Sequence, residues 1–227
     1  NQIFKEPYLD LNIKKDFNHW KNEIKGKEIM NSTLRLKRSG DPKKIKGYEE
    51  GAWWVQNLGA QIPVKLLGKI KNENVLDLCA APGGKTAQLL NEGALVTAID
   101  VSEKKIKKLY FNISRLKLEK NLTAFSKDFM KWNNKKKYNK ILLDVPCTAT
   151  GTIRKNPDVL WNKNKKDIDR LSKVQSKLLS KAIDSLSRNG TLIYSNCSMQ
   201  FEEGEKVIDF FIKKNKVKLL PIKAEEL

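Results

Sequence analysis

The sequence has few of the residues on which many catalytic and metal sites depend. It contains one histidine, His19, and three cysteines, Cys79, Cys147 and Cys197. The cysteines lie far apart and form no C-x-x-C pair, which argues against a disulfide framework or a zinc knuckle. A Ser-His-Asp or Cys-His nucleophile would need His19, and nothing around that residue supports one. We therefore predict no metal site, and the free thiols favour a cytoplasmic location.

Long apolar runs are missing as well. No stretch approaches the roughly 20 apolar residues of a membrane-spanning helix, so we expect no membrane partner. The first residues, Asn1-Gln2-Ile3, include no methionine and lack the layout of a signal peptide. We interpret the sequence as a piece of a longer chain and expect a monomer. Its 227 residues, 40% of them hydrophobic, suffice for one large domain or one domain and part of a neighbour.

Acidic residues are scarce relative to basic ones. The chain has 26 aspartates and glutamates and 45 lysines and arginines, which gives a net charge of +19. This excess favours a polyanionic partner, and nucleic acid comes first. An AT-rich genome would also supply many lysines, so charge alone leaves both explanations open.

Helix and strand patterns alternate through most of the chain, which predicts the α/β class with a mostly parallel sheet in a domain of residues 47–227. Residues 1–46 are polar and basic, with an alternating strand pattern at 32–37, and we interpret them as a partial α+β segment of an RNA-binding type. A glycine cap at 188–190 should end the helix predicted at 167–186. The strands of the larger domain are predicted over 75–78, 94–100, 122–125, 138–144, 191–195 and 217–220, and its helices over 101–118, 167–186 and 204–214.

The stretch 74–86, NVLDLCAAPGGKT, holds the strongest local signal. An apolar strand runs into small residues and a glycine pair, after which a helix begins. This arrangement directs backbone N–H groups at a ligand. Glycine lets the ligand come close because it has no Cβ.

Three interpretations of this stretch compete: a nucleoside-cofactor loop, a phosphate-binding P-loop and a plain strand-to-helix turn. A P-loop needs glycine where Cys79 stands, and the G-x-G-x-x-G spacing of dinucleotide-binding folds is absent too. A plain turn would not need so many small residues together. The cofactor loop is therefore favoured.

Acidic residues and cysteines follow the other predicted strands. Asp100 ends the second strand, where a carboxylate can accept hydrogen bonds from ribose hydroxyls. Asp128 follows the third strand, either near a ligand or as the cap of a turn. Asp144 and Cys147 follow the fourth strand, and Cys197 follows the fifth. Because open parallel sheets bind ligands at the carboxyl ends of their strands, these residues form a candidate site.

The two strand-end cysteines suggest covalent catalysis. A thiolate can add to an electron-poor ring carbon and make the neighbouring carbon nucleophilic. The alternative is that both cysteines are small buried hydrophobes, but their places beside Asp144 and Pro146 favour catalysis. The nearby segment with Arg154, Lys155 and Trp161 mixes basic and aromatic residues, which suits a loop facing nucleic acid.

Three motifs in this order make the chain resemble the RNA (cytosine-C5) methyltransferases, and more closely the bacterial Sun/RsmB-type enzymes that act on small-subunit ribosomal RNA. The resemblance covers about residue 30 to the C-terminus, and residues 51–61 match the lead-in to the family fold. It implies a Rossmann-like sheet, S-adenosylmethionine as methyl donor and RNA as substrate. The motifs are residues 77–86, the run 144–152 continued through Arg154, 156–158 and Trp161, and residues 194–198.

The resemblance also implies roles for individual residues. Cys197 matches the nucleophile that attacks C6 of cytosine, after which C5 takes the methyl group, and Cys147 matches the thiol that assists release. Asp144 would contact the target cytosine and the methionine end of the cofactor. Asp100 would hold the ribose hydroxyls, and Asp128 would approach the adenine. The cofactor loop would consist of Cys79, Ala80, Ala81, Pro82, Gly83, Gly84 and Lys85.

Some features depart from the family pattern. Asn196 precedes Cys197 where threonine is usual, and Val145 stands where alanine is common. The family's N-terminal helical RNA-binding domain and its closing strands are expected to lie outside this sequence. Two alternatives stay open: a DNA cytosine-C5 methyltransferase that uses Cys147 after Pro146, and a non-catalytic RNA-binding assembly factor that keeps the fold.

Overall fold

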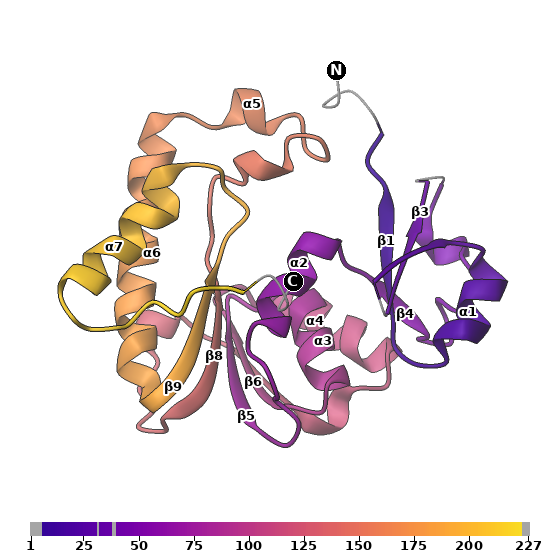
Figure 1. Cartoon of the computed structure of the whole chain (residues 1–227), viewed down its shortest axis with the longest axis horizontal. Coiled ribbons are helices and arrows are strands. Elements are labelled where there is room, and N and C mark those ends of the chain that lie inside the picture. The colour runs from indigo at the N-terminus through magenta and orange to yellow at the C-terminus, as the bar shows by residue number, and fades with distance from the viewer. Residues whose placement is uncertain (1–5, 31, 38–39, 224–227) are drawn as a thin grey trace.

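The computed structural model describes residues 6–30, 32–37 and 40–223, which form two β-sheets of different construction (Figure 1). The smaller sheet is antiparallel, with the strand order β2-β3-β1-β4. The larger sheet has five parallel strands in the order β7-β6-β5-β8-β9. The strands are β1 (Leu9–Ile13), β2 (Lys27–Met30), β3 (Thr33–Leu36), β4 (Trp53–Val55), β5 (Asn74–Leu78), β6 (Leu95–Asp100), β7 (Leu122–Ser126), β8 (Tyr138–Asp144) and β9 (Leu186–Ser195).

Helices cover both faces of the larger sheet, with α3 and α4 on one side and α6 and α7 on the other (Figure 1). Successive residues of β5 show why: Val75 packs into the cluster under α3 and α4, while Leu76 packs into the cluster under α6 and α7. A strand buried on both faces needs the continuous apolar run seen in the sequence. The helices are α1 (Phe17–Ile24), α2 (Leu58–Lys65), α3 (Gly84–Asn91), α4 (Glu103–Arg115), α5 (Val159–Asn162), α6 (Lys165–Ser185) and α7 (Glu205–Lys213).

The order of the strands fixes where a ligand can bind. From β5 the chain moves outward to β6 and β7, then returns to place β8 on the opposite side of β5 and β9 beyond it. The direction in which successive strands are added to the sheet therefore reverses between β5 and β8. In doubly wound sheets the crevice at the carboxyl ends of the strands beside such a reversal is the ligand site. The predicted α/β fold with a Rossmann-like parallel sheet is confirmed.

The smaller sheet extends past the predicted boundary at residue 46. Strand β4 pairs with β1, with Ile13 opposite Trp53, so residues 53–55 are part of this sheet. The division into domains at residues 46 and 47 stays a prediction. Trp53 is fully buried there with Leu11 and Leu34. The sequence indicated no partner for so short an apolar run, since the pairing is made with a strand some forty residues earlier. The strand predicted at 32–37 corresponds to β3.

The two sheets are joined through the end of α4. The Arg115 guanidinium donates to the carbonyls of Tyr48 and Trp53 and stacks 4.1 Å above the Tyr48 ring. Lys14 Nζ donates to the Leu116 carbonyl at 2.7 Å. Gly51 permits this approach, because a Cβ there would lie 2.0 Å from the Arg115 carbonyl oxygen. The two sheets therefore meet through specific polar contacts.

Two local predictions are wrong. The glycine cap at 188–190 does not exist, because α6 ends at Ser185 and the chain enters β9 directly at Leu186, which pairs with Tyr138. The strand predicted at 217–220 is also absent; Leu219 and Leu220 are exposed and no strand pairs with this segment. An apolar run forms a strand only where a partner edge and a buried face are available. None of the described helices combines the length and apolarity that crossing a membrane requires.

Candidate active site

The turn after β5 has the tight geometry that its small residues predict. Strand β5 ends at Leu78, Cys79 and Gly83 adopt left-handed backbone conformations with φ of 59° and 102°, and α3 begins at Gly84. Gly83 is further constrained, since a Cβ would approach Leu109 Cγ to 3.0 Å. A Cβ on Gly84 would meet nothing within 4 Å, so open space lies beside the start of α3. The turn therefore has room for a ligand.

Asp100 lies directly on this turn. Its Oδ2 accepts a hydrogen bond from the Ala81 amide at 3.3 Å, and its Oδ1 accepts one from the Ser102 amide at 3.0 Å. The carboxylate is thus fixed by the backbone at the end of β6, beside the cofactor loop predicted from the sequence.

Asp77 is a buried acid that the site prediction missed. It is 1% exposed, its Oδ2 accepts from Thr86 Oγ1 at 2.7 Å, and its Oδ1 has no hydrogen-bond partner. Burial raises the pKa of Asp77 from 3.8 to about 7. The sequence did indicate Asp77, because an acid within an apolar strand is unfavourable unless it is hydrogen-bonded, paired with a charge or functional.

Asp144 links the cofactor turn to the cysteine-bearing strands. Lys85 Nζ, from the first turn of α3, lies 2.7 Å from Asp144 Oδ2. Ser195 Oγ, from the end of β9, donates to Asp144 Oδ1 at 2.7 Å. One carboxylate therefore joins elements that follow β5, β8 and β9.

The two cysteines meet at the ends of β8 and β9. Their sulfurs lie 3.4 Å apart; Cys197 is exposed and Cys147 is half-buried. The hydrogen bond from Cys197 lowers the pKa of Cys147 to about 7. The same bond raises the pKa of Cys197 well above its ordinary value, because it is the thiol that donates. Near neutral pH the pair can therefore hold one proton and one negative charge.

Gly151 brings the two cysteine loops into contact. Its amide donates to the Cys197 carbonyl at 2.9 Å, and a Cβ at this position would lie 2.8 Å from the same oxygen. Asn196 also orders its loop, because its Oδ1 accepts from the Ser198 amide at 2.8 Å. Asn196 therefore helps to fix the conformation of the Cys197 loop.

Cys79 and Asp128 have less direct relations to the site. Burial, together with the charges of Asp100 and Asp144, raises the pKa of Cys79 to about 12, so it stays a neutral thiol. Asp128 accepts from the Met130 amide at 2.9 Å and caps the short helix 129–131. Capping was one of the two roles considered for Asp128; its approach to an adenine stays a prediction.

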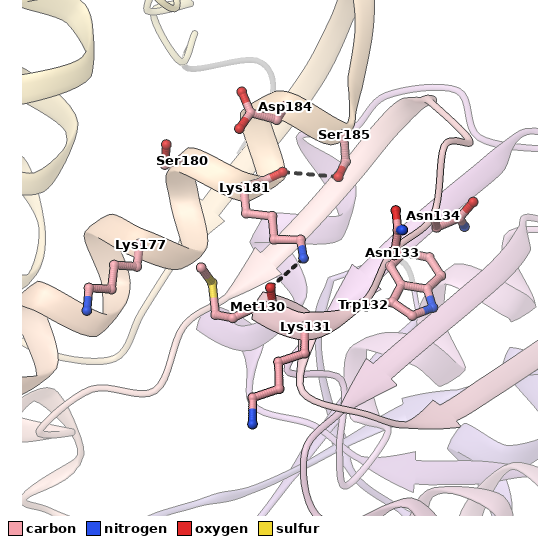
Figure 2. A pocket seen from close by; sticks show the side chains of 10 residues that line it. All are labelled: Met130, Lys131, Trp132, Asn133, Asn134, Lys177, Ser180, Lys181, Asp184 and Ser185. Carbon is pink, nitrogen blue, oxygen red and sulfur yellow. Dashed lines mark hydrogen bonds between the residues drawn. The ribbon is translucent and has the colours of Figure 1, made fainter.

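One hollow on the described surface lies away from this site. It measures about 620 Å³, lies between α6 and the segment that follows β7, and contains none of the predicted site residues (Figure 2). Lys181 crosses it to the Met130 carbonyl at 2.7 Å. Its lining is Met130, Lys131, Trp132, Asn133, Asn134, Lys177, Ser180, Lys181, Asp184 and Ser185.

A second hollow of about 420 Å³ adjoins the cysteine loops at Thr148 and Thr150 and extends along α5 to the start of α6. In the part of the chain that the structure describes, no group of three or more His, Cys, Asp or Glu side chains could hold a metal ion. The chemistry available here is that of a thiol pair and carboxylates.

Comparison with known proteins gives the family of the chain. Residues 64–227 match the family model described as 16S rRNA methyltransferase RsmB/F. The chain belongs to this family. A Citrobacter koseri protein named ribosomal RNA small subunit methyltransferase B is 38% identical over 184 residues, which are 80% of this chain and 43% of that protein.

Solved structures share the fold of this chain. A crystal structure described as PH0851 superimposes with a TM-score of 0.91 at 28% identity, over 98% of this chain and 54% of that one. A Pyrococcus horikoshii structure described as NSun6 with SFG gives a TM-score of 0.71 at 34% identity, over 78% and 46%. The chain thus spans less than half the length of the curated relative.

Proposed function

We propose that this RsmB/F-family chain carries the catalytic centre of an S-adenosylmethionine-dependent RNA (cytosine-C5) methyltransferase that acts on small-subunit ribosomal RNA. The observation that carries the proposal is the 3.4 Å approach of the Cys147 and Cys197 sulfurs next to Asp144. The family description and the name of the Citrobacter koseri relative support ribosomal RNA as the substrate.

The turn and its carboxylates suit S-adenosylmethionine, which is a cation at its sulfonium. Asp100 and Asp144 give the turn a negative potential, and both raise the pKa of Cys79. Open space beside Gly84 leaves room for the ligand, and the Asp100 carboxylate borders it. The NSun6 structure holds SFG, an S-adenosylmethionine analogue. When bound, the cofactor supplies an electrophilic methyl group.

The cysteine pair can perform covalent catalysis on a cytosine ring. The Cys197 sulfur forms a bond to C6 while its proton passes to the Cys147 thiolate at 3.4 Å. The electron pair of the C5–C6 double bond becomes available at C5, which takes the methyl group. Loss of the C5 proton to water restores the double bond and expels the Cys197 sulfur as a thiolate. The Cys147 thiol assists this release by returning the proton to Cys197, so the pair regains its starting state.

Exposure and acidity favour different nucleophiles. The lowered pKa would make Cys147 the thiolate, as the DNA-type alternative requires, whereas the exposed position favours Cys197 as the sulfur that meets a base. We assign Cys197 because its exposed side chain is more accessible to a base than the half-buried Cys147, and because proton transfer across the pair supplies its thiolate. A base would first have to leave its stack to reach this site.

Methyl transfer from tritiated S-adenosylmethionine to small-subunit ribosomal RNA tests the proposal. The full-length parent should incorporate label, and its Cys197→Ser variant should lose about 10³-fold or more of the rate. Binding of RNA by the parent without any incorporation would support the non-catalytic assembly factor instead. A cytoplasmic location and a monomeric state stay predictions, and light scattering on the purified chain tests the second.

A further inference from the structure

A buried glutamate lies behind the cysteine pair. Glu203 closes the short helix 201–203, between the Cys197 loop and α7, and is 0% exposed. A carboxylate removed from water is unfavourable unless hydrogen bonds replace its hydration. The hydrogen-bond donors to the Glu203 carboxylate therefore indicate its role.

On one side, Glu203 holds the loop of Cys147. The Thr148 amide donates to Oε1 at 3.0 Å and to Oε2 at 3.2 Å, and the Thr148 hydroxyl donates to Oε2 as well. Gln175 of α6 donates through Nε2 both to Glu203 Oε1 at 3.0 Å and to the Pro146 carbonyl at 2.9 Å. Both residues that flank Cys147 are thus tied to this carboxylate, one directly and one through Gln175.

On the other side, the same residue holds the loop of Cys197. The Glu203 carbonyl accepts from Asn196 Nδ2 at 3.0 Å and from the Tyr194 hydroxyl at 2.7 Å. Ser198 Oγ lies 3.1 Å from Thr148 Oγ1, which links the residue after Cys197 back to the first loop. Thr148 and Gln175 are themselves 0% exposed, so the network is closed to water.

We propose that Glu203 is a positioning residue that sets the separation of Cys147 and Cys197 and so lets the two sulfurs share a proton. The proposal deepens the function above and rests on it, because the shared proton is what the covalent mechanism uses. Hydrogen bonds to a buried charge are short and directional, and those to the Glu203 carboxylate come from Thr148 and Gln175, on the side of Cys147. The residue before Cys197, Asn196, is held by the main-chain carbonyl of Glu203 instead. An uncharged side chain at this position would keep the main-chain bond to Asn196 and change only the bonds that hold the Cys147 loop.

The test measures the sulfurs directly, without RNA. The whole chain is treated with iodoacetamide across pH 5 to 10, and alkylation of each cysteine is followed by peptide mass spectrometry. In the unmodified protein, the alkylation of Cys147 should rise around pH 7. In Glu203→Gln, one acceptor becomes a donor facing the Thr148 amide, which should move the Cys147 loop and shift the rise toward the ordinary thiol value of about 8.5. Loss of the Glu203 charge alone would shift the rise the other way, because that charge raises the pKa of Cys147, so an upward shift reports the changed position.

Activity gives the second readout. Glu203→Gln should lower the kcat of methyl transfer about 10- to 100-fold, as a small misplacement of reacting groups does, while KM for the cofactor stays unchanged. The matched control is Glu205→Gln, the same charge change at an exposed position on α7. It should keep the alkylation profile and the activity.

A second pair of variants tests the proposal if Glu203→Gln does not fold. Thr148→Val removes one hydroxyl donor to Glu203 at nearly constant volume, and Thr148→Ser keeps it. The valine variant should shift the Cys147 profile in the same direction by a smaller amount, and the serine variant should match the unmodified protein. An unchanged profile in a folded Glu203→Gln, or in Thr148→Val if the first does not fold, would overturn the proposal. Failure of methyl transfer by the unmodified parent would instead count against the proposed function.

Discussion

The two halves of the site are held together in different ways. On the β5–β6 side, the cofactor turn is shaped by its own backbone: left-handed Cys79 and Gly83, and an Asp100 carboxylate that accepts from amides. On the β8–β9 side, the cysteine loops are held by bonds between residues distant from one another in sequence, such as those from Thr148 and Gln175 to Glu203. The first half can therefore be recognised from a short sequence motif. The second half depends on contacts that form only when the chain folds.

The largest expected effect comes from cutting the link between the halves. Asp144→Asn keeps the shape of the side chain but removes the charge that holds Lys85 and accepts from Ser195. We expect the kcat of methyl transfer to fall about 10²- to 10³-fold, as for loss of one charge-stabilising group, in single-turnover assays.

The control for Asp144→Asn is Asp209→Asn, at an exposed position on α7. It should leave kcat unchanged. An equal loss of activity in both variants would mean that the effect is not local to the site.

The buried acid of the cofactor half should make stability depend on pH. The pKa of Asp77 is raised from 3.8 to about 7 in the folded protein, so between these values the folded state keeps a proton that the unfolded chain releases. The free energy of unfolding should therefore fall as pH rises from about 4 to about 7, by about 2–4 kcal/mol from this group, and then level off.

Urea unfolding of the unmodified protein and of Asp77→Asn at stepped pH checks this sign. The variant cannot ionise, so the difference between the two proteins should change across that window and stay constant above about pH 8. Parallel curves would show that Asp77 ionises normally in the folded state.

Neighbouring glycines give a sharper test of the turn. Gly83→Ala should lower the free energy of unfolding by about 2–3 kcal/mol, because its left-handed backbone and the Leu109 contact both resist a Cβ. Gly84→Ala should leave stability unchanged and weaken S-adenosylmethionine binding, since its Cβ would enter the open space. Chemical unfolding and calorimetry measure the two quantities, and equal stability of the two variants would contradict this account of the turn.

The smallest expected effect separates two acids at strand ends. Asp100→Ala should weaken S-adenosylmethionine binding by about 1–2 kcal/mol through lost charged hydrogen bonds. Asp128→Ala should weaken it less, because Asp128 caps a local turn. Calorimetric titration of both variants decides the order, and a larger loss for Asp128 would reverse these assignments.

The sequence predicted the half that depends on local chemistry. The apolar strand, the small residues and the glycine pair indicated the β5 turn, and the strand ends indicated Asp100, Asp144 and the two cysteines. It did not separate Glu203 from Glu202 and Glu205, because three acids in one run look alike until packing buries one of them. The sequence also predicted a strand at residues 217–220, where an apolar run is present but the described chain forms no strand.

The most direct test of the central claim is a covalent adduct with RNA. Cys147→Ser and Cys197→Ser variants of the full-length parent are incubated with small-subunit ribosomal RNA and S-adenosylmethionine, then resolved on a denaturing gel. If Cys197 attacks C6 and Cys147 assists release, Cys147→Ser should accumulate a protein–RNA band and Cys197→Ser should form none. The opposite pattern, with the band in Cys197→Ser alone, would contradict the assignment of the nucleophile.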